Sequence, residues 1–77
     1  MISHEKSEEV LKLLKKNIGT PFTSNEIATI LQEKMTIYHS EVLRILFEQL
    51  ALGDWLGYKK IGRFHLFWYR PLPKSKN

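Results

Sequence analysis

The spacing of apolar residues in this chain changes once, at Gly53-Asp54, and this change limits the fold more than any other feature. Before it, apolar residues recur at the spacing of amphipathic helices. After it, aromatic residues and other β-formers dominate two runs, 55–60 and 64–70. The sequence therefore predicts helices first and a two-stranded hairpin last. A chain of 77 residues builds only one small core, which excludes a two-domain enzyme and any barrel or doubly wound fold.

The first helix is predicted from its ends and from one apolar stripe. Ser3 or Ser7 can cap its start, because a hydroxyl accepts a hydrogen bond from the free N–H groups of the first turn. The helix should end at about Asn17, since Gly19 follows. Its stripe consists of Val10, Leu11, Leu14 and Ile18.

A very short strand, 22–23, is expected before the second helix. Thr23 and Glu26 have the spacing of a capping box, with Ser24 as the alternative cap one residue later. This helix is predicted to continue to about Glu33.

The third helix is expected to begin at a Thr36 cap and to run to about Leu52. On a helical wheel its apolar residues gather on one face, with His39 beside them. That face carries Val42, Leu43, Leu46, Phe47 and Leu50. The opposite face carries Ser40, Glu41, Arg44 and Glu48.

The hairpin is predicted to turn at Ile61-Gly62, where glycine supplies a positive φ. One face of the hairpin then pairs Trp55 with Trp68, Gly57 with Leu66 and Lys59 with Phe64. The other face pairs Leu56 with Phe67 and Tyr58 with His65.

Both hairpin faces are apolar near the base, so one of them should be left in water after the other covers the helices. Exposed apolar patches usually mark an interface. We therefore expect Trp55, Leu66 and Trp68 to form the contact of a homodimer. The alternative is that the segment 71–73 or the first helix folds over this face.

Positive charge is concentrated in the last third of the chain. Twelve Lys and Arg against eight Asp and Glu give a net charge of +4. Residues 1–54 hold six basic and eight acidic groups, so 6 − 8 gives −2, whereas residues 55–77 hold six basic groups and no acid, giving +6. A polyanion would approach that end most favourably. The alternative is a basic end that only keeps the protein soluble.

The predicted order of helix, short strand, helix, helix and hairpin resembles the winged helix-turn-helix family of DNA-binding domains. The resemblance rests on the start of the second helix at 22–28, the Val42, Leu46 and Leu50 spacing, the helix end and first wing residues at 52–56, and the basic turn at 60–63. It covers about residues 7 to 70. It implies an α+β domain over 1–70, with three helices, a short strand and a C-terminal two-stranded β-hairpin wing, followed by a basic tail over 71–77.

In this family the third helix enters the major groove and the wing touches the backbone or the minor groove. The resemblance implies helix contacts from Tyr38, His39, Ser40, Glu41 and Arg44. It implies wing contacts from Lys59, Lys60 and Arg63. Ser24 and Asn25 would lie near a phosphate.

Several of these residues also have a structural interpretation. Arg44 can bind a guanine or a phosphate, or instead pair with Glu41 or Glu48. Tyr38 can donate to DNA or pack against the second helix. His39 is interpreted first as a partly buried, hydrogen-bonded histidine. Glu41 can accept from a cytosine amine, but an acid on this helix argues against nonspecific DNA binding.

Other classes of function find no support in the sequence. The absence of cysteine excludes disulfides and thiolate metal sites, and the three histidines lack metal-ligand spacing. Neither a phosphate-cradling glycine loop nor a catalytic set is recognisable, so an enzyme, a cofactor and a small-molecule ligand are not expected. No apolar run approaches the ~20 residues of a membrane span, and the N-terminus does not read as a secretory signal. A cytoplasmic location is the default expectation.

The sequence thus predicts a sequence-specific double-stranded DNA-binding protein, a small transcriptional regulator acting as a homodimer. Two third helices would then occupy successive major grooves about 34 Å apart. The alternative is a winged-helix protein-interaction module, a small subunit of a larger assembly. Two features favour that alternative: the acidic residues of the third helix, and the presence of more aromatic residues in the wing than one buried face requires.

Overall fold

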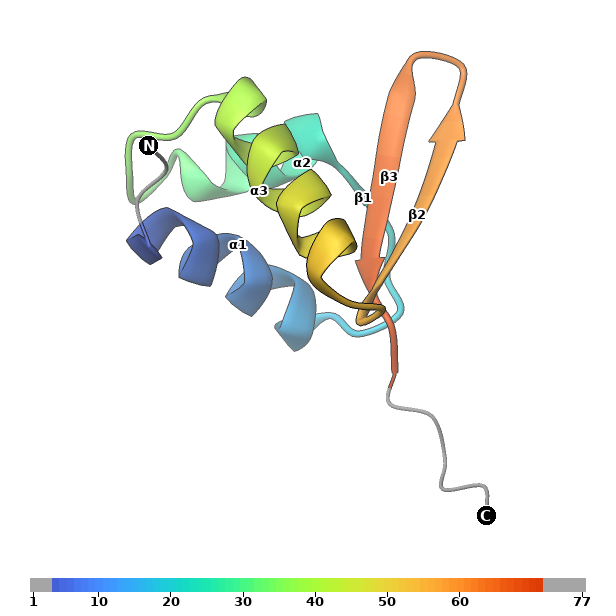
Figure 1. The fold of residues 1–77 in the computed structure, drawn as a ribbon. Helices are drawn as coiled ribbons and strands as arrows, with labels where there is room; N and C mark the ends of the chain where they lie inside the picture. The colour runs from blue at the N-terminus through green and yellow to red at the C-terminus, as the bar shows by residue number, and fades with distance from the viewer. Residues whose placement is uncertain (1–3, 72–77) are drawn as a thin grey trace.

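The computed structural model describes residues 4–71. Its elements are α1 (His4–Lys16), β1 (Phe22–Thr23), α2 (Ser24–Leu31), α3 (His39–Leu52), β2 (Leu56–Ile61) and β3 (Phe64–Tyr69). The strands form one antiparallel sheet in the order β1-β3-β2, and the helices lie on one side of it (Figure 1). The predicted order of elements and the α+β class are confirmed. Ser3 and most of the predicted basic tail, 72–77, lie outside the described residues.

The start of α2 follows the sequence prediction. The Thr23 Oγ1 atom accepts a hydrogen bond from the Glu26 N–H at 3.1 Å, and Glu26 Oε1 accepts from the Thr23 N–H at 2.8 Å. This reciprocal capping box satisfies two N–H groups that the first turn would otherwise leave free. In α1, by contrast, Ser7 lies within the helix rather than at its cap.

The third helix begins later than predicted, at His39 instead of just after Thr36. The cause is Ile37, whose side chain is buried in the core at 1% exposure and whose carbonyl accepts from Gln32 Nε2 at 2.8 Å. The segment must therefore stay extended until Tyr38. The Tyr38 N–H is then bound by the Glu41 carboxylate, at 2.9 Å, rather than by a threonine cap.

The core lies between the helices and the inner sheet face. It comprises Val10, Leu14, Ile27, Ala28, Leu31, Ile37, Val42, Ile45, Leu46, Leu56 and Phe67. The buried stripe of α3 is thus rotated toward Ile45 relative to the predicted face. Leu43 and Leu50 are only half-buried, and Phe47 is 40% exposed. The rotation arises because α3 packs against α1 and α2 as well as against the hairpin.

The hairpin turns at Gly62-Arg63, one residue later than predicted, and its register differs accordingly. Gly57 pairs with Trp68, and Ile61 pairs with Phe64. The positive φ predicted for Gly62 is confirmed at 59°. Relative to the predicted pairing, the strands have slipped by two residues. Because side chains alternate with a period of two, the side chains of β2 and β3 keep their predicted faces.

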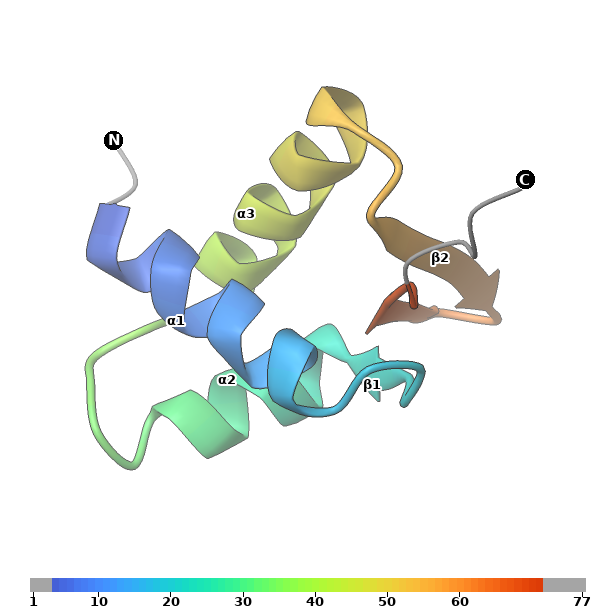
Figure 2. The ribbon, with the colours of Figure 1, turned by 90° about the horizontal axis from the view of Figure 1, so that it is seen from below.

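The two faces of the hairpin have different surroundings. The inner face, with Leu56 and Phe67, covers the helices. The opposite face of the hairpin, which we call the outer sheet face, consists of Gly57, Lys59, Ile61, Phe64, Leu66 and Trp68. A view turned by 90° places all three helices on the inner side (Figure 2). Within residues 4–71, no helix combines the length and apolarity needed to cross a membrane.

Candidate nucleic-acid interface

The starts of α2 and α3 meet the turn of the hairpin around a pocket of about 190 Å³, which we call the wing pocket. It is lined by Thr23, Ser24, Asn25, His39, Arg63, Phe64 and His65. The pocket brings together four of the residues that the resemblance assigned to DNA contacts: Ser24, Asn25, His39 and Arg63. Its lining includes a guanidinium and two imidazoles but no carboxylate.

A short hydrogen bond fixes the floor of the wing pocket. Ser24 is 2% exposed, and its Oγ lies 2.6 Å from Nε2 of His39. The expected hydrogen bond of His39 is confirmed. The expected partial burial is wrong, because the His39 residue is exposed. The bond ties the first residue of α2 to the first residue of α3.

Glu41 is held on the α1 side of α3 rather than presented to solvent. Its Oε2 accepts from Lys6 Nζ at 2.7 Å, while its Oε1 accepts from the Tyr38 N–H. The hydrogen bond from Lys6, followed by that from the Tyr38 backbone, lowers the pKa of Glu41 below its usual 4.5. This carboxylate therefore stabilises the fold, and its charge is compensated by Lys6.

The other predicted contacts on α3 are exposed. Tyr38 is 63% exposed, which disagrees with the alternative that it packs against the second helix. Ser40 and Arg44 are exposed on the same helix. Among residues 4–71, no ion pair joins Arg44 to Glu41 or Glu48. The start of α3 thus presents a phenol, a hydroxyl and a guanidinium to solvent.

The wing cations surround the hairpin turn. Lys59, Lys60 and Arg63 are all exposed, and in the described part of the chain none of them has an ion-pair partner. Lys60 pairs with His65 on the inner face, whereas Lys59 pairs with Leu66 on the outer face. Positive charge therefore flanks the wing on both sides and at its turn.

An aromatic cluster that the sequence analysis did not identify fixes the wing against α3. The Phe47 ring lies edge-on to Tyr58, His65 and Phe67, with centroids 5.4 to 5.6 Å apart. Tyr58 Oη is 2.7 Å from His65 Nδ1. The alternation of Tyr58, His65 and Phe67 on one hairpin face was the available signal. The fourth ring of the cluster belongs to Phe47, which the sequence analysis placed on the apolar face of the third helix.

The expected dimer contact is altered by the position of Trp55. Trp55 Nε1 donates to Gln49 Oε1 at 3.1 Å, and the half-buried ring packs against the core. The expectation that this indole is left in water on the outer face is therefore wrong. Trp68 and Leu66 do lie on that face, half-buried, and the Trp68 ring lies directly over Gly57. Most of the 71–73 segment, the alternative cover, lies outside the described residues.

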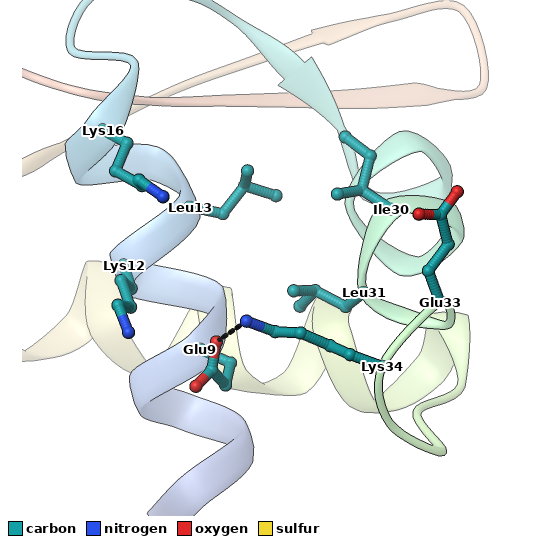
Figure 3. A pocket seen from close by; sticks show the side chains of 8 residues that line it. All are labelled: Glu9, Lys12, Leu13, Lys16, Ile30, Leu31, Glu33 and Lys34. Carbon is teal, nitrogen blue, oxygen red and sulfur yellow. Dashed lines mark ion pairs between the residues drawn. The ribbon is translucent and has the colours of Figure 1, made fainter.

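A larger cavity, of about 410 Å³, lies between α1 and α2 (Figure 3). Lys34 Nζ donates to Glu9 Oε1 across it at 2.8 Å, and this bond lowers the pKa of Glu9. The lining mixes lysines and glutamates, so it does not select a ligand of one charge. Across residues 4–71, no group of three or more histidines and acids is placed to hold a metal ion.

Comparison with known proteins identifies the fold. No protein-family model and no curated protein matches the chain. A solved structure from work on the DNA recognition and protein interaction domains of HOP2, and on its homologous DNA pairing, aligns with 82% of this chain and 95% of that chain. The TM-score is 0.68 and the sequence identity is 19%. The chain therefore has the winged helix-turn-helix fold, in which β2 and β3 form the wing.

Proposed function

We propose that this protein binds double-stranded DNA through the start of α3 and the wing. The observation that carries the proposal is the wing pocket. There, two helix starts and the wing turn bring Arg63, His39 and His65 together without a carboxylate. Such a lining suits a phosphate oxygen, because guanidinium and imidazole N–H groups donate to it and helix N-termini favour negative charge. The study of HOP2 concerns DNA recognition, which adds support.

The exposed start of α3 supplies groups suited to the major groove. A guanidinium such as that of Arg44 can bind guanine bidentately, and Tyr38 and Ser40 can donate to base edges or phosphates. The one acid in the first turn of α3, Glu41, is compensated by Lys6 and so does not repel the phosphates strongly. Lys59 and Lys60 would lie against the backbone or the minor groove.

The same proposal extends to a sequence-specific regulator acting as a homodimer. Leu66 and Trp68 on the outer sheet face are the residues we assign to the contact between copies. Both are apolar, and no helix within residues 4–71 covers that face. Two copies would place their α3 helices in successive major grooves about 34 Å apart. Regulation would follow from occupying a promoter or recruiting a partner to it.

The experiment is selection from a pool of random-sequence duplexes, with the mass of the protein in solution measured alongside. A two-fold-symmetric site enriched by a dimer is expected. Arg44→Ala, Lys60→Ala and Arg63→Ala should each weaken binding. Lys12→Ala, which removes an exposed lysine of α1, should not. Equal binding by all variants would contradict the proposed surface and favour the protein-interaction module.

A further inference from the structure

The turn of the wing carries two large apolar side chains in an unusual position. Ile61 and Phe64 are each 51% exposed, and they pair directly across the strands on either side of the Gly62-Arg63 turn. Hairpin turns are ordinarily flanked by polar residues, since they project into water. The hairpin extends outward to its turn (Figure 1), where Phe64 also lines the wing pocket beside the starts of α2 and α3. Among the described residues, neither side chain belongs to the buried core.

The surroundings of this apolar pair are basic. Lys59 and Lys60 lie in the strand just before it, and Arg63 lies between its two members. Residues 55–71 contain no acid. An apolar tip flanked by cations is complementary to a partner whose outer surface is negatively charged and whose interior offers apolar faces. Stacked base pairs between two phosphate backbones provide that combination.

We propose that Ile61 and Phe64 act as a wedge that enters the minor groove, partly unstacks a base step and bends the duplex. This inference rests on the proposed DNA binding and assigns it a further activity. Proteins that insert apolar side chains between base pairs kink DNA by roughly 20–90°. The cations beside the wedge would hold the two backbones, and bending brings more phosphates within their reach.

Two other partners fit the tip less well. A second copy docked tip to tip would bring a second set of the same cations against Lys59, Lys60 and Arg63, and like charges at an interface are unfavourable. A membrane surface would gain only two apolar side chains. The contact between copies proposed above lies nearer the base of the hairpin, at Leu66 and Trp68, and leaves the tip free.

The test measures DNA bending separately from DNA binding. A duplex of about 20 base pairs carries a donor and an acceptor dye at its ends, so that bending shortens the distance between the dyes. The 77-residue chain is titrated at low salt, and affinity and energy transfer are recorded together. Phe64→Ala, Phe64→Thr and Ile61→Ala are compared with the wild type. The threonine variant keeps a β-former in the strand. Ile18→Ala is the matched control, since Ile18 is 55% exposed and lies outside the wing.

The wild type and Ile18→Ala are expected to raise energy transfer on binding. The three tip variants should lose most of that rise. In Ile61→Ala, whose side chain lies outside the wing pocket, the affinity should change by less than about tenfold, because the phosphate contacts remain. Wild-type binding without a rise, or a full rise in Phe64→Ala, would overturn the wedge and leave the proposed function standing. A tip variant that halves the mass of the free protein but keeps the bend would make the tip a contact between copies. Absence of any duplex binding at low salt would refute the proposed function itself.

Discussion

At the scale of the residue, Glu41 links α1, the segment before α3 and α3 itself. Its ionised carboxylate accepts from Lys6 and from the Tyr38 N–H only in the folded state, which is why its pKa lies below 4.5 there. The unfolded chain binds this proton at a higher pH than the folded chain. The stabilisation is therefore fully present above pH 4.5 and is lost as the pH falls through the folded-state pKa.

We expect Glu41→Gln to reduce the loss of stability in acid. The amide oxygen still accepts from the Tyr38 N–H, but it does not titrate. The measurement is urea unfolding at about pH 7 and about pH 3. Glu48→Gln, which changes an exposed acid of α3, serves as the control. Its free energy of unfolding should fall between about pH 7 and about pH 3 by as much as that of the wild type. If the free energy of unfolding of Glu41→Gln falls in acid by as much as that of the wild type, Glu41 does not contribute to the loss of stability in acid.

Gly62 allows a second prediction at this scale. Its φ of 59° lies in the left-handed region, where a Cβ meets the neighbouring carbonyl. Gly62→Ala should lower the free energy of unfolding by about 1 kcal/mol. Gly62→Asn should cost less, because asparagine tolerates this conformation better than other residues with a side chain. Denaturant unfolding of the two variants checks the order. The reverse order would mean that steric strain at this φ is not what limits the turn.

At the scale of the element, the contact between α3 and the wing rests on Phe47. Its ring is 40% exposed, yet it meets three rings of the hairpin. Phe47→Ala should cost about 2 kcal/mol, less than the loss of a fully buried phenylalanine. It should also weaken DNA binding, because the wing is no longer held at a fixed angle to α3. Leu52→Ala removes a 70% exposed side chain of the same helix and should change neither property. Thermal unfolding and duplex titration of both variants measure the two effects.

Elements whose signals are local were predictable from the sequence. The capping box needs only Thr23 and Glu26 at the right spacing, and both bonds form. The start of α3 was not predictable in this way, because it depends on Ile37 reaching the core. The hairpin register was ambiguous for a different reason. A turn at 61–62 or at 62–63 places Gly62 at a positive φ, and both choices put the same side chains on the same faces.

For the candidate site, the sequence indicated which residues could belong to it but not how they contact one another. The resemblance named His39 and Ser24 as possible DNA contacts, and they lie in one pocket. Their mutual hydrogen bond joins residues fifteen apart in the chain, so only the packing of α2 against α3 creates it. Glu41 illustrates the converse. Nothing in the spacing of α3 indicates that Lys6 of another helix will hold its carboxylate.

At the scale of the whole molecule, charge is distributed so that the wing end attracts polyanions. Residues 55–77 carry +6, whereas residues 1–54 carry −2. Within the described residues, the ion pairs of Glu41 and Glu9 tie lysines to acids away from the wing, while Lys59, Lys60 and Arg63 have no such partners. DNA affinity should therefore fall steeply as salt rises, with a logarithmic slope of about −0.9 for each phosphate neutralised.

The same slope reports how many copies bind. Removing one phosphate contact makes the slope shallower by about one. Lys60→Ala should therefore reduce the magnitude of the slope by about one in a monomer and by about two in a dimer, where the contact occurs twice. Lys12→Ala should leave it unchanged. The measurement is duplex affinity over a series of salt concentrations, for the wild type and both variants. A change of about two, together with a dimer mass for the complex, would agree with the proposed homodimer. A change of about one would mean that a single copy contacts the DNA, and an unchanged slope would remove Lys60 from the interface.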